Sequence, residues 1–154
     1  MIQPQTLEIR NGEKIPAIFS KEEMDNRLQA IRSLMEEQKL DGILFTSFHN
    51  INYFDHFLYT AFGRNYGLVV TRDRICSVTA NIDGGQPWRR GVGENLIYTD
   101  WQRDNFFAAV QELLRDSQKV GVEYDHLSLQ NLEKLEFVLP QTDFADISET
   151  VMQQ

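Results

Sequence analysis

Short, mostly apolar runs recur along this chain and constrain its fold more than any other feature. Each run is three or four residues long and is followed by polar residues or glycine. The runs are residues 43–45, 68–70, 75–78, 96–98 and 120–122. An apolar run of this length is typical of a β-strand that is covered on both faces. The sequence therefore predicts a central sheet that is packed between helices.

Helical patterns precede and separate these runs. Ser20 followed by Glu23 is a capping-box signature, and the apolar residues after it fall on one helical stripe. Thr99 and Gln102 form the same signature and predict the start of a second helix. A third helix is predicted from regularly spaced leucines, and it ends before Pro140.

The connections complete the predicted order of elements. Residues 72–74 are a polar link short enough for a β-hairpin, and residues 81–93 are rich in glycine and predict a loop that carries Trp88. Short extended pieces are expected near residues 7–9 and at 144–147. The order indicates one α/β domain over residues 1–154, with a mixed parallel and antiparallel sheet of about five to six strands flanked by helices.

Charge and composition narrow the classes of function. The net charge of −8 argues against nucleic-acid binding, which requires a basic stripe. No apolar stretch reaches eighteen residues, so we expect no membrane span. The N-terminus has no signal-peptide pattern, and the single cysteine, Cys76, is expected to be a buried apolar side chain in a reducing compartment. These features predict a cytoplasmic protein.

A search for catalytic motifs finds no complete active site. His49 and His56 are too far apart in sequence to share a metal ion without further ligands, so no metal is predicted. Asp125 and His126 lie between a strand and a helix, where an aspartate is expected to cap the helix. No nucleophile motif and no phosphate loop is present, so no cofactor is predicted.

One stretch suggests a binding surface instead. Residues 47–71 combine seven aromatic side chains with a single arginine, in the triplet Phe62-Gly63-Arg64. A guanidinium is a planar fork that matches a carboxylate, and a glycine allows a ligand to approach the backbone closely. Phe62 and Arg64 are therefore the candidate substrate-binding residues, and no catalytic residue is predicted.

Several unusual segments resemble the N-terminal domain of the creatinases (creatine amidinohydrolases). They are FTSFHNINYFDHFLYTAFGRNYGLVVT, SVTANIDGGQPWRRGVGENLIYTDWQRDNFFAAVQ and GVEYDHLSLQNLEKL. The wider group is the creatinase/aminopeptidase/prolidase superfamily, and the resemblance covers nearly the whole chain from about residue 6. It implies a ribonuclease H-like α/β fold, in agreement with the order of elements derived above.

The resemblance also implies a function. Creatinases hydrolyse creatine to sarcosine and urea without a metal, and their catalytic residues lie in a C-terminal "pita-bread" domain that residues 1–154 do not contain. The N-terminal domain covers the active site of the other subunit in a homodimer. There an aromatic and an arginine, matching Phe62 and Arg64 here, close over the substrate and pair with its carboxylate. The isolated domain is expected to be inactive.

Two alternatives keep part of this interpretation. In the first, the parent protein has the chemistry of a Xaa-Pro peptidase, and its activity depends on a metal held by the missing half. In the second, the chain is a self-standing module that binds another protein through its aromatic surface, and the natural polypeptide ends near Gln154.

Overall fold

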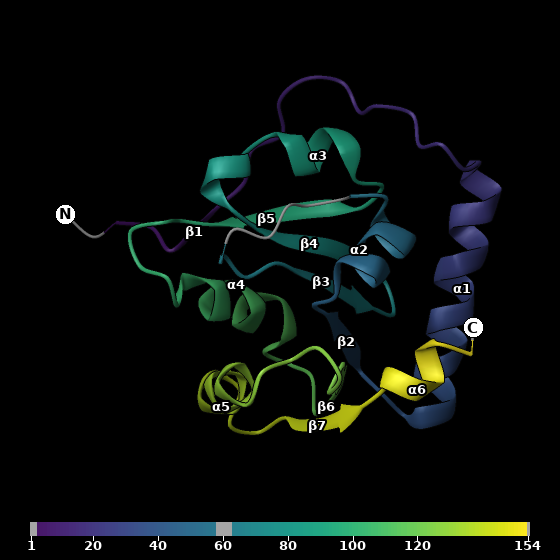
Figure 1. Cartoon of the computed structure of the whole chain (residues 1–154), viewed down its shortest axis with the longest axis vertical. Coiled ribbons are helices and arrows are strands. Elements are labelled where there is room, and N and C mark those ends of the chain that lie inside the picture. The colour runs from purple at the N-terminus through teal and green to yellow at the C-terminus, as the bar shows by residue number, and fades with distance from the viewer. Residues whose placement is uncertain (1–2, 58–62, 154) are drawn as a thin grey trace.

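The computed structural model describes residues 3–57 and 63–153 of the chain. Within them, seven strands form one sheet in the order β1-β5-β4-β3-β2-β6-β7 (Figure 1). The strands are β1 (Thr6–Leu7), β2 (Gly42–Phe45), β3 (Gly67–Thr71), β4 (Ile75–Ala80), β5 (Glu94–Tyr98), β6 (Lys119–Val122) and β7 (Asp143–Asp146). The helices are α1 (Lys21–Gln38), α2 (Phe48–Asp55), α3 (Gln86–Arg90), α4 (Asn105–Leu114), α5 (Leu129–Val138) and α6 (Ser148–Val151), with a 3₁₀ turn η1 (Asn81–Asp83).

The sheet is mixed, and its strand directions define two edges. Strands β4 and β5 are parallel to each other, as are β2, β6 and β7, and β3 lies antiparallel between β4 and β2. Five strands therefore point the same way, and their carboxyl ends meet along one edge, which we call the carboxyl edge. The opposite edge is the amino edge. Because β3 runs the other way, it begins at the carboxyl edge.

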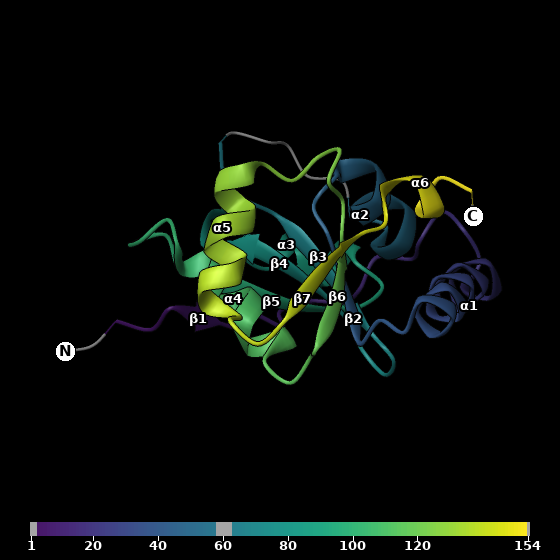
Figure 2. The ribbon, with the colours of Figure 1, turned by 90° about the horizontal axis from the view of Figure 1, so that it is seen from below.

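Helices cover both faces of this sheet. Figure 2 shows α4 and α5 on one side of the sheet and α1 and α2 on the other. The central strands are accordingly buried throughout: Ile43, Leu44 and Phe45 are 0% exposed, and Leu68 and Val70 are 0% exposed as well. The prediction of strands covered on both faces is confirmed, and so is the mixed α/β architecture.

The first helix begins as the sequence predicts. Ser20 is the N-cap of α1, and its hydroxyl accepts a hydrogen bond from the backbone N–H of Glu23 at 3.1 Å. The carboxylate of Glu23 does not bond back to the cap. It accepts from Nε of Arg27 at 2.9 Å, so only half of the capping box forms.

The predicted start of the second helix is wrong. Helix α4 begins at Asn105, six residues after Thr99, and its N-cap residue, Asp104, makes no capping hydrogen bond through its side chain. The hydroxyl of Thr99 instead donates to the carbonyl of Pro4 at 2.6 Å, and it accepts from Nδ2 of Asn105 at 3.1 Å. A long-range contact therefore uses the hydroxyl that the local pattern assigned to capping.

Two further details differ from the sequence analysis. Residues 81–93 are not simply a loop, because they contain η1 and α3, and Pro87 in the first turn of α3 suits a helix start. The described residues form seven strands rather than five to six. One of them, β1, is only two residues long and lies where the sequence indicates a short extended piece.

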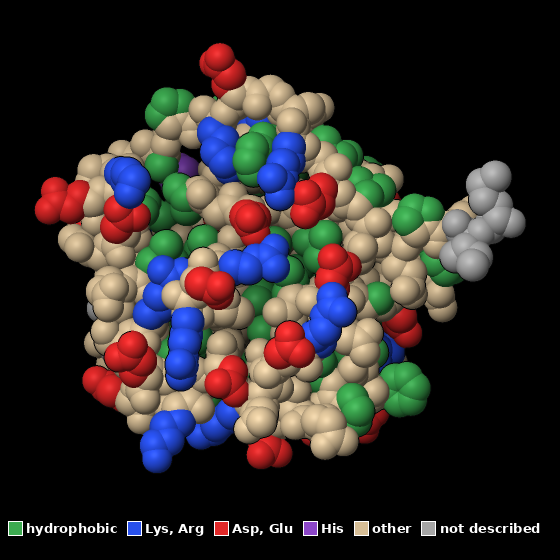
Figure 3. Space-filling view, turned by 180° about the vertical axis from the view of Figure 1, so that it is seen from behind, with side chains coloured by type: hydrophobic (Ala, Val, Ile, Leu, Met, Phe, Trp, Pro, Cys, Tyr) green, Lys and Arg blue, Asp and Glu red, His purple; other side chains and the backbone are tan. Residues whose placement is uncertain are grey.

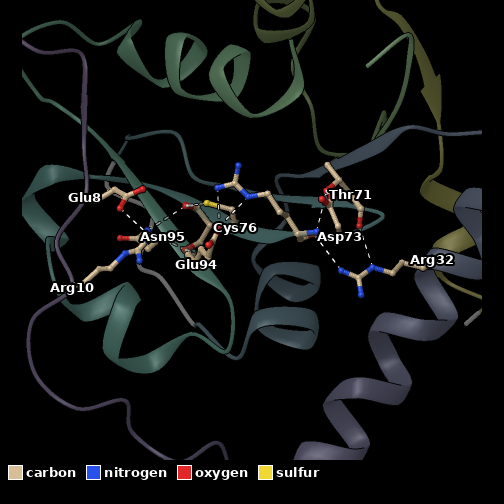
Figure 4. Close-up of polar contacts among 10 residues, drawn as sticks. Glu8, Arg10, Arg32, Thr71, Asp73, Cys76, Glu94 and Asn95 are labelled. Atoms are coloured by element: carbon tan, nitrogen blue, oxygen red, sulfur yellow. Dashed lines mark hydrogen bonds and ion pairs between the residues drawn. The ribbon is translucent and has the colours of Figure 1, made fainter. Parts of the chain in front are cut away.

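The predicted hairpin between β3 and β4 is confirmed, and its turn lies at the amino edge. Backbone N–H of Thr71 donates to the carbonyl of Arg74 at 2.9 Å. Arg32 of α1 donates through Nε to the carbonyl of Thr71 at 3.1 Å (Figure 4). The guanidinium of Arg74 pairs with Glu94 of β5 at 2.7 Å. Polar groups at this edge thus find partners close by.

Charges of both signs are mixed on one face of the molecule. On the face that Figure 3 shows, Lys and Arg side chains alternate with Asp and Glu side chains and do not gather into a basic patch. Among the residues that the structure describes, no helix is both long and apolar enough to cross a membrane.

Candidate functional site at the carboxyl edge

Arg64 lies at the carboxyl edge, just before β3 begins. This edge is where ligands commonly bind in α/β sheets, because the loops that follow parallel strands converge there. The residue before it, Gly63, has a φ of +73°. Among the described residues other than its chain neighbours, no heavy atom lies within 4 Å of the place where a Cβ of Gly63 would be, so it is the positive φ that favours glycine here. The other candidate, Phe62, lies outside the described residues.

Among the residues that the structure describes, the ion-pair partner of the Arg64 guanidinium is Asp100, and the contact is long. Nε of Arg64 lies 3.5 Å from Oδ1 of Asp100, a residue that follows β5, and the two side chains are 38% and 35% exposed. A partly exposed ion pair at this distance contributes at most about 1 kcal/mol. Arg64 can therefore exchange Asp100 for the carboxylate of a ligand at small cost.

A small polar pocket of about 160 Å³ opens beside Arg64. Its walls come from the ends of β2 and β6, the starts of α4 and α5, and the segment before β3. They are lined by Thr46, Arg64, Asn65, Tyr66, Phe106, His126, Leu127, Ser128 and Asn131. A larger hollow of about 490 Å³ lies beside α1, but its lining is mostly apolar and includes no arginine or histidine. The polar pocket brings hydrogen-bonding side chains together with the guanidinium of Arg64 at the carboxyl edge.

Buried Glu123 connects the backbone segments that lie next to this pocket. It follows β6, is 3% exposed, and accepts four hydrogen bonds through its two carboxylate oxygens. The donors are the backbone N–H groups of Thr46 and Ser47, at 2.6 and 2.9 Å, the hydroxyl of Ser47 and the side-chain amide of Asn50, both at 2.6 Å. Glu123 thereby joins the end of β6 to the end of β2 and the start of α2.

The sequence analysis did not single out Glu123, and it expected Asp125 to cap the third helix. That expectation is wrong, because Ser128 is the N-cap of α5 and accepts from the N–H of Asn131 at 3.1 Å. His126 lies on the pocket wall, and its Nδ1 is 2.9 Å from the hydroxyl of Thr46. The position of Glu123 directly after a buried strand is the local feature that could have indicated this role.

Two tyrosine hydroxyls make hydrogen bonds that hold the segment around Arg64 in place. The hydroxyl of Tyr98 donates to the carbonyl of Asn65 at 3.0 Å, and that of Tyr66 donates to the carboxylate of Asp83. Burial raises the pKa of Tyr98 to about 12, and burial together with the Asp83 contact raises the pKa of Tyr66. Both phenols therefore stay protonated at neutral pH and remain hydrogen-bond donors.

The histidines and the cysteine make ordinary packing contacts. The ring of His49 lies against Phe48, and Nε2 of His56 accepts from the backbone of Ile18 at 3.3 Å. Cys76 is buried, and desolvation raises the pKa of its thiol to about 12, which leaves it unreactive at neutral pH. Within residues 3–57 and 63–153, no group of three or more His, Cys, Asp or Glu side chains is placed to hold a metal ion.

One buried acid lies apart from this site, near the amino edge. Asp55, at the end of α2, is 0% exposed, and its Oδ1 accepts from the N–H of Gly93 at 2.8 Å. Desolvation raises its pKa to about 7, against the opposing effects of the Gly93 bond and the charge of Lys14. No local sequence pattern indicates that this carboxyl is buried, because an aspartate at a helix end is usually exposed.

Comparison with known proteins assigns the family. The family model described as "Creatinase/Prolidase N-terminal domain" matches residues 27–154. The chain is 48% identical over 145 residues to a protein named Creatinase from Bacillus sp. (strain B-0618). That alignment covers 92% of this chain and 35% of the relative, so the chain spans about a third of the relative's length.

Solved structures share the fold. The N-terminal domain of an X-Pro dipeptidase from Streptococcus pyogenes has a TM-score of 0.75 and 17% identity, and the match covers 84% of this chain and 98% of that one. A proline dipeptidase from Streptococcus pneumoniae has a TM-score of 0.74 and 22% identity, covering 82% and 94%. A Xaa-Pro dipeptidase from Bacillus anthracis has a TM-score of 0.71 and 22% identity, covering 84% and 35%. The chain therefore belongs to the creatinase/prolidase N-terminal domain family.

Proposed function

We propose that this chain is the N-terminal domain of a creatine amidinohydrolase and that it supplies Arg64, together with Phe62, to the active site of a partner subunit. The observation that carries the proposal is the 48% identity to a protein named Creatinase over 92% of the chain. The dipeptidase structures, at 22% identity or less, share the fold and do not bear on the substrate.

The geometry of Arg64 suits this role. Its guanidinium is partly exposed, lies beside a polar pocket at the carboxyl edge, and holds only a loose contact with Asp100. Creatine carries a carboxylate that a guanidinium binds in a bidentate manner. In the proposed homodimer, Arg64 fixes this carboxylate while residues outside the 154-residue chain carry out the hydrolysis to sarcosine and urea.

The first experiment measures the length of the natural polypeptide. Intact mass of the protein from its source is expected to be more than twice the 18.0 kDa of this chain. A mass near 18.0 kDa would leave Arg64 without an active site to complete and would contradict the proposal.

The second experiment tests Arg64 in that natural polypeptide. Arg64→Met should lower kcat/KM for creatine about 10- to 100-fold, because a charge-assisted contact with a carboxylate contributes about 1.5–3 kcal/mol. Most of the loss should appear in KM, since the carboxylate is bound equally in the ground state and the transition state. The matched control is Arg72→Met, because Arg72 is exposed in the hairpin turn at the amino edge.

A third measurement separates the proposal from the peptidase alternative. Creatine hydrolysis should persist after treatment with a chelator. Hydrolysis of a Xaa-Pro dipeptide that is lost with the chelator, combined with no urea release from creatine, would favour the metallopeptidase chemistry instead.

A further inference from the structure

We infer that Tyr98 and Arg103 are positioning residues that clamp the backbone on both sides of Arg64 and so orient its guanidinium toward the ligand carboxylate. This inference rests on the proposed function of Arg64 and adds to it the residues that prepare the arginine for binding.

The two clamps bind carbonyls on either side of Arg64. Nη2 of Arg103 donates to the carbonyl of Gly63 at 2.7 Å, and the hydroxyl of Tyr98 donates to the carbonyl of Asn65 at 3.0 Å. The peptide unit that precedes Arg64 and the peptide unit that follows Asn65 are therefore both held by side chains. Arg103 makes a charge-assisted hydrogen bond, which is the stronger kind.

Both clamps come from one segment of the chain. Tyr98 ends β5, Arg103 lies five residues later, and Asp100, the partner of Arg64, lies between them. Tyr98 is 3% exposed, and its ring packs edge-on against Phe106 of α4, with centroids 5.7 Å apart. Because Tyr98 is packed in the core, its hydrogen bond restricts the motion of the backbone beside Arg64.

This rigidity matters because the clamped segment starts from a permissive residue. Gly63 has a positive φ, and no described heavy atom beyond its chain neighbours lies within 4 Å of its Cβ position, so side-chain packing by the described residues does not fix the backbone there. Without the clamps, the segment would have to be ordered each time a ligand binds, and that cost lowers affinity. The hydrogen bonds from Tyr98 and Arg103 order the segment before the ligand binds, so binding does not have to supply this ordering.

The test is a double-mutant cycle on the natural polypeptide, with KM and kcat for creatine as readouts. Arg103→Met should raise KM about five- to tenfold and leave kcat within about twofold, as expected for a lost pre-organising contact. Arg103→Lys should restore most of the affinity, because an ammonium can still donate to the Gly63 carbonyl. Tyr98→Phe should raise KM in the same way. Arg115→Met, at an exposed arginine just after α4, is the matched control.

The cycle is completed in the Arg64→Met background. There, Arg103→Met should have no further effect on KM, because it acts only through Arg64. An equal rise in KM in both backgrounds would overturn the inference and show that Arg103 acts by another route. An unchanged KM in Arg103→Met, when Arg64→Met raises KM, would overturn it as well. If Arg64→Met itself leaves KM unchanged, the proposed function fails.

A second readout tests the clamp without any substrate. The 154-residue chain has its own core, and the solved Streptococcus pyogenes structure, 98% of which this chain matches, consists of such a domain alone. In the ¹⁵N-labelled chain, the heteronuclear NOE of the Arg64 Nε–H group should fall in Arg103→Met and recover in Arg103→Lys. An unchanged NOE would overturn the clamp even if Arg64 binds the substrate.

Discussion

The two edges of the sheet satisfy their polar groups in opposite ways. At the hairpin turn on the amino edge, the charged pair is exposed to solvent: Arg74 and Glu94 are 47% and 45% exposed. At the carboxyl edge, a single buried carboxylate, Glu123, accepts four hydrogen bonds from within, while Arg64 keeps only a 3.5 Å contact. At the amino edge, the charged side chains of Arg74 and Glu94 pair with each other. At the carboxyl edge, the buried network around Glu123 is rigid, and the guanidinium of Arg64 remains available to a ligand.

The largest effect on stability is expected from the buried carboxylate. Glu123→Gln keeps the shape but replaces one acceptor oxygen by a donor that faces other donors. This should lower the free energy of unfolding by about 3–5 kcal/mol, as for other buried charged networks that lose a partner. Urea denaturation measures the loss, with Glu133→Gln on the exposed face of α5 as the control. A loss below about 1 kcal/mol would mean that the carboxyl edge is not organised by Glu123.

The buried acid near the amino edge should make stability depend on pH. The folded-state pKa of Asp55 is raised to about 7 from 3.8, so the native state holds a proton that the unfolded state has lost. The contribution of Asp55 is fully present below pH 3.8 and is lost as the pH rises through about 7. The loss amounts to up to about 4 kcal/mol.

Asp55→Asn isolates this effect. The difference in unfolding free energy between the variant and the original chain should shift in favour of the variant between pH 4 and pH 8. Parallel stability curves across that range would show that Asp55 does not retain its proton in the folded chain. Lys14→Met is a second variant for the same measurement, because the positive charge of Lys14 is one of the influences that lower the pKa of Asp55.

The smallest effect is expected from the exposed pair at the amino edge. Glu94→Gln should lower the free energy of unfolding by less than about 1 kcal/mol, because solvent screens the pair with Arg74. Salt titration should reduce the difference further. A loss as large as that of Glu123→Gln would erase the contrast between the two edges.

The sequence predicts those parts of the fold that local pattern encodes. The strand at Ile43–Phe45 and the cap at Ser20 were predicted correctly, since burial on both faces and capping depend on neighbouring residues. The role of Thr99 was predicted wrongly, because its hydroxyl contacts Pro4, 95 positions away. No local pattern contains that partner.

The candidate site was likewise predicted only in part. Arg64 stood out by its residue type among aromatic side chains, and the fold adds that it lies at the carboxyl edge beside a polar pocket. Its role as a ligand for substrate stays a prediction. Glu123 and Asp55 were missed because acidic residues at element ends are usually solvated, and their burial depends on strands and loops that are distant in sequence.

The shortest strand determines where a fragment of this protein can safely begin. Thr6 and Leu7 of β1 pair with Tyr98 and Ile97 of β5, and the carbonyl of Gln5 accepts from the N–H of Thr99 at 2.9 Å. The family match begins only at residue 27, so a fragment cut at that boundary loses β1 and bares the outer side of β5. An uncovered strand of this kind recruits strands from other molecules. Such a fragment is expected to aggregate, whereas one that begins before residue 4 keeps β5 paired with β1.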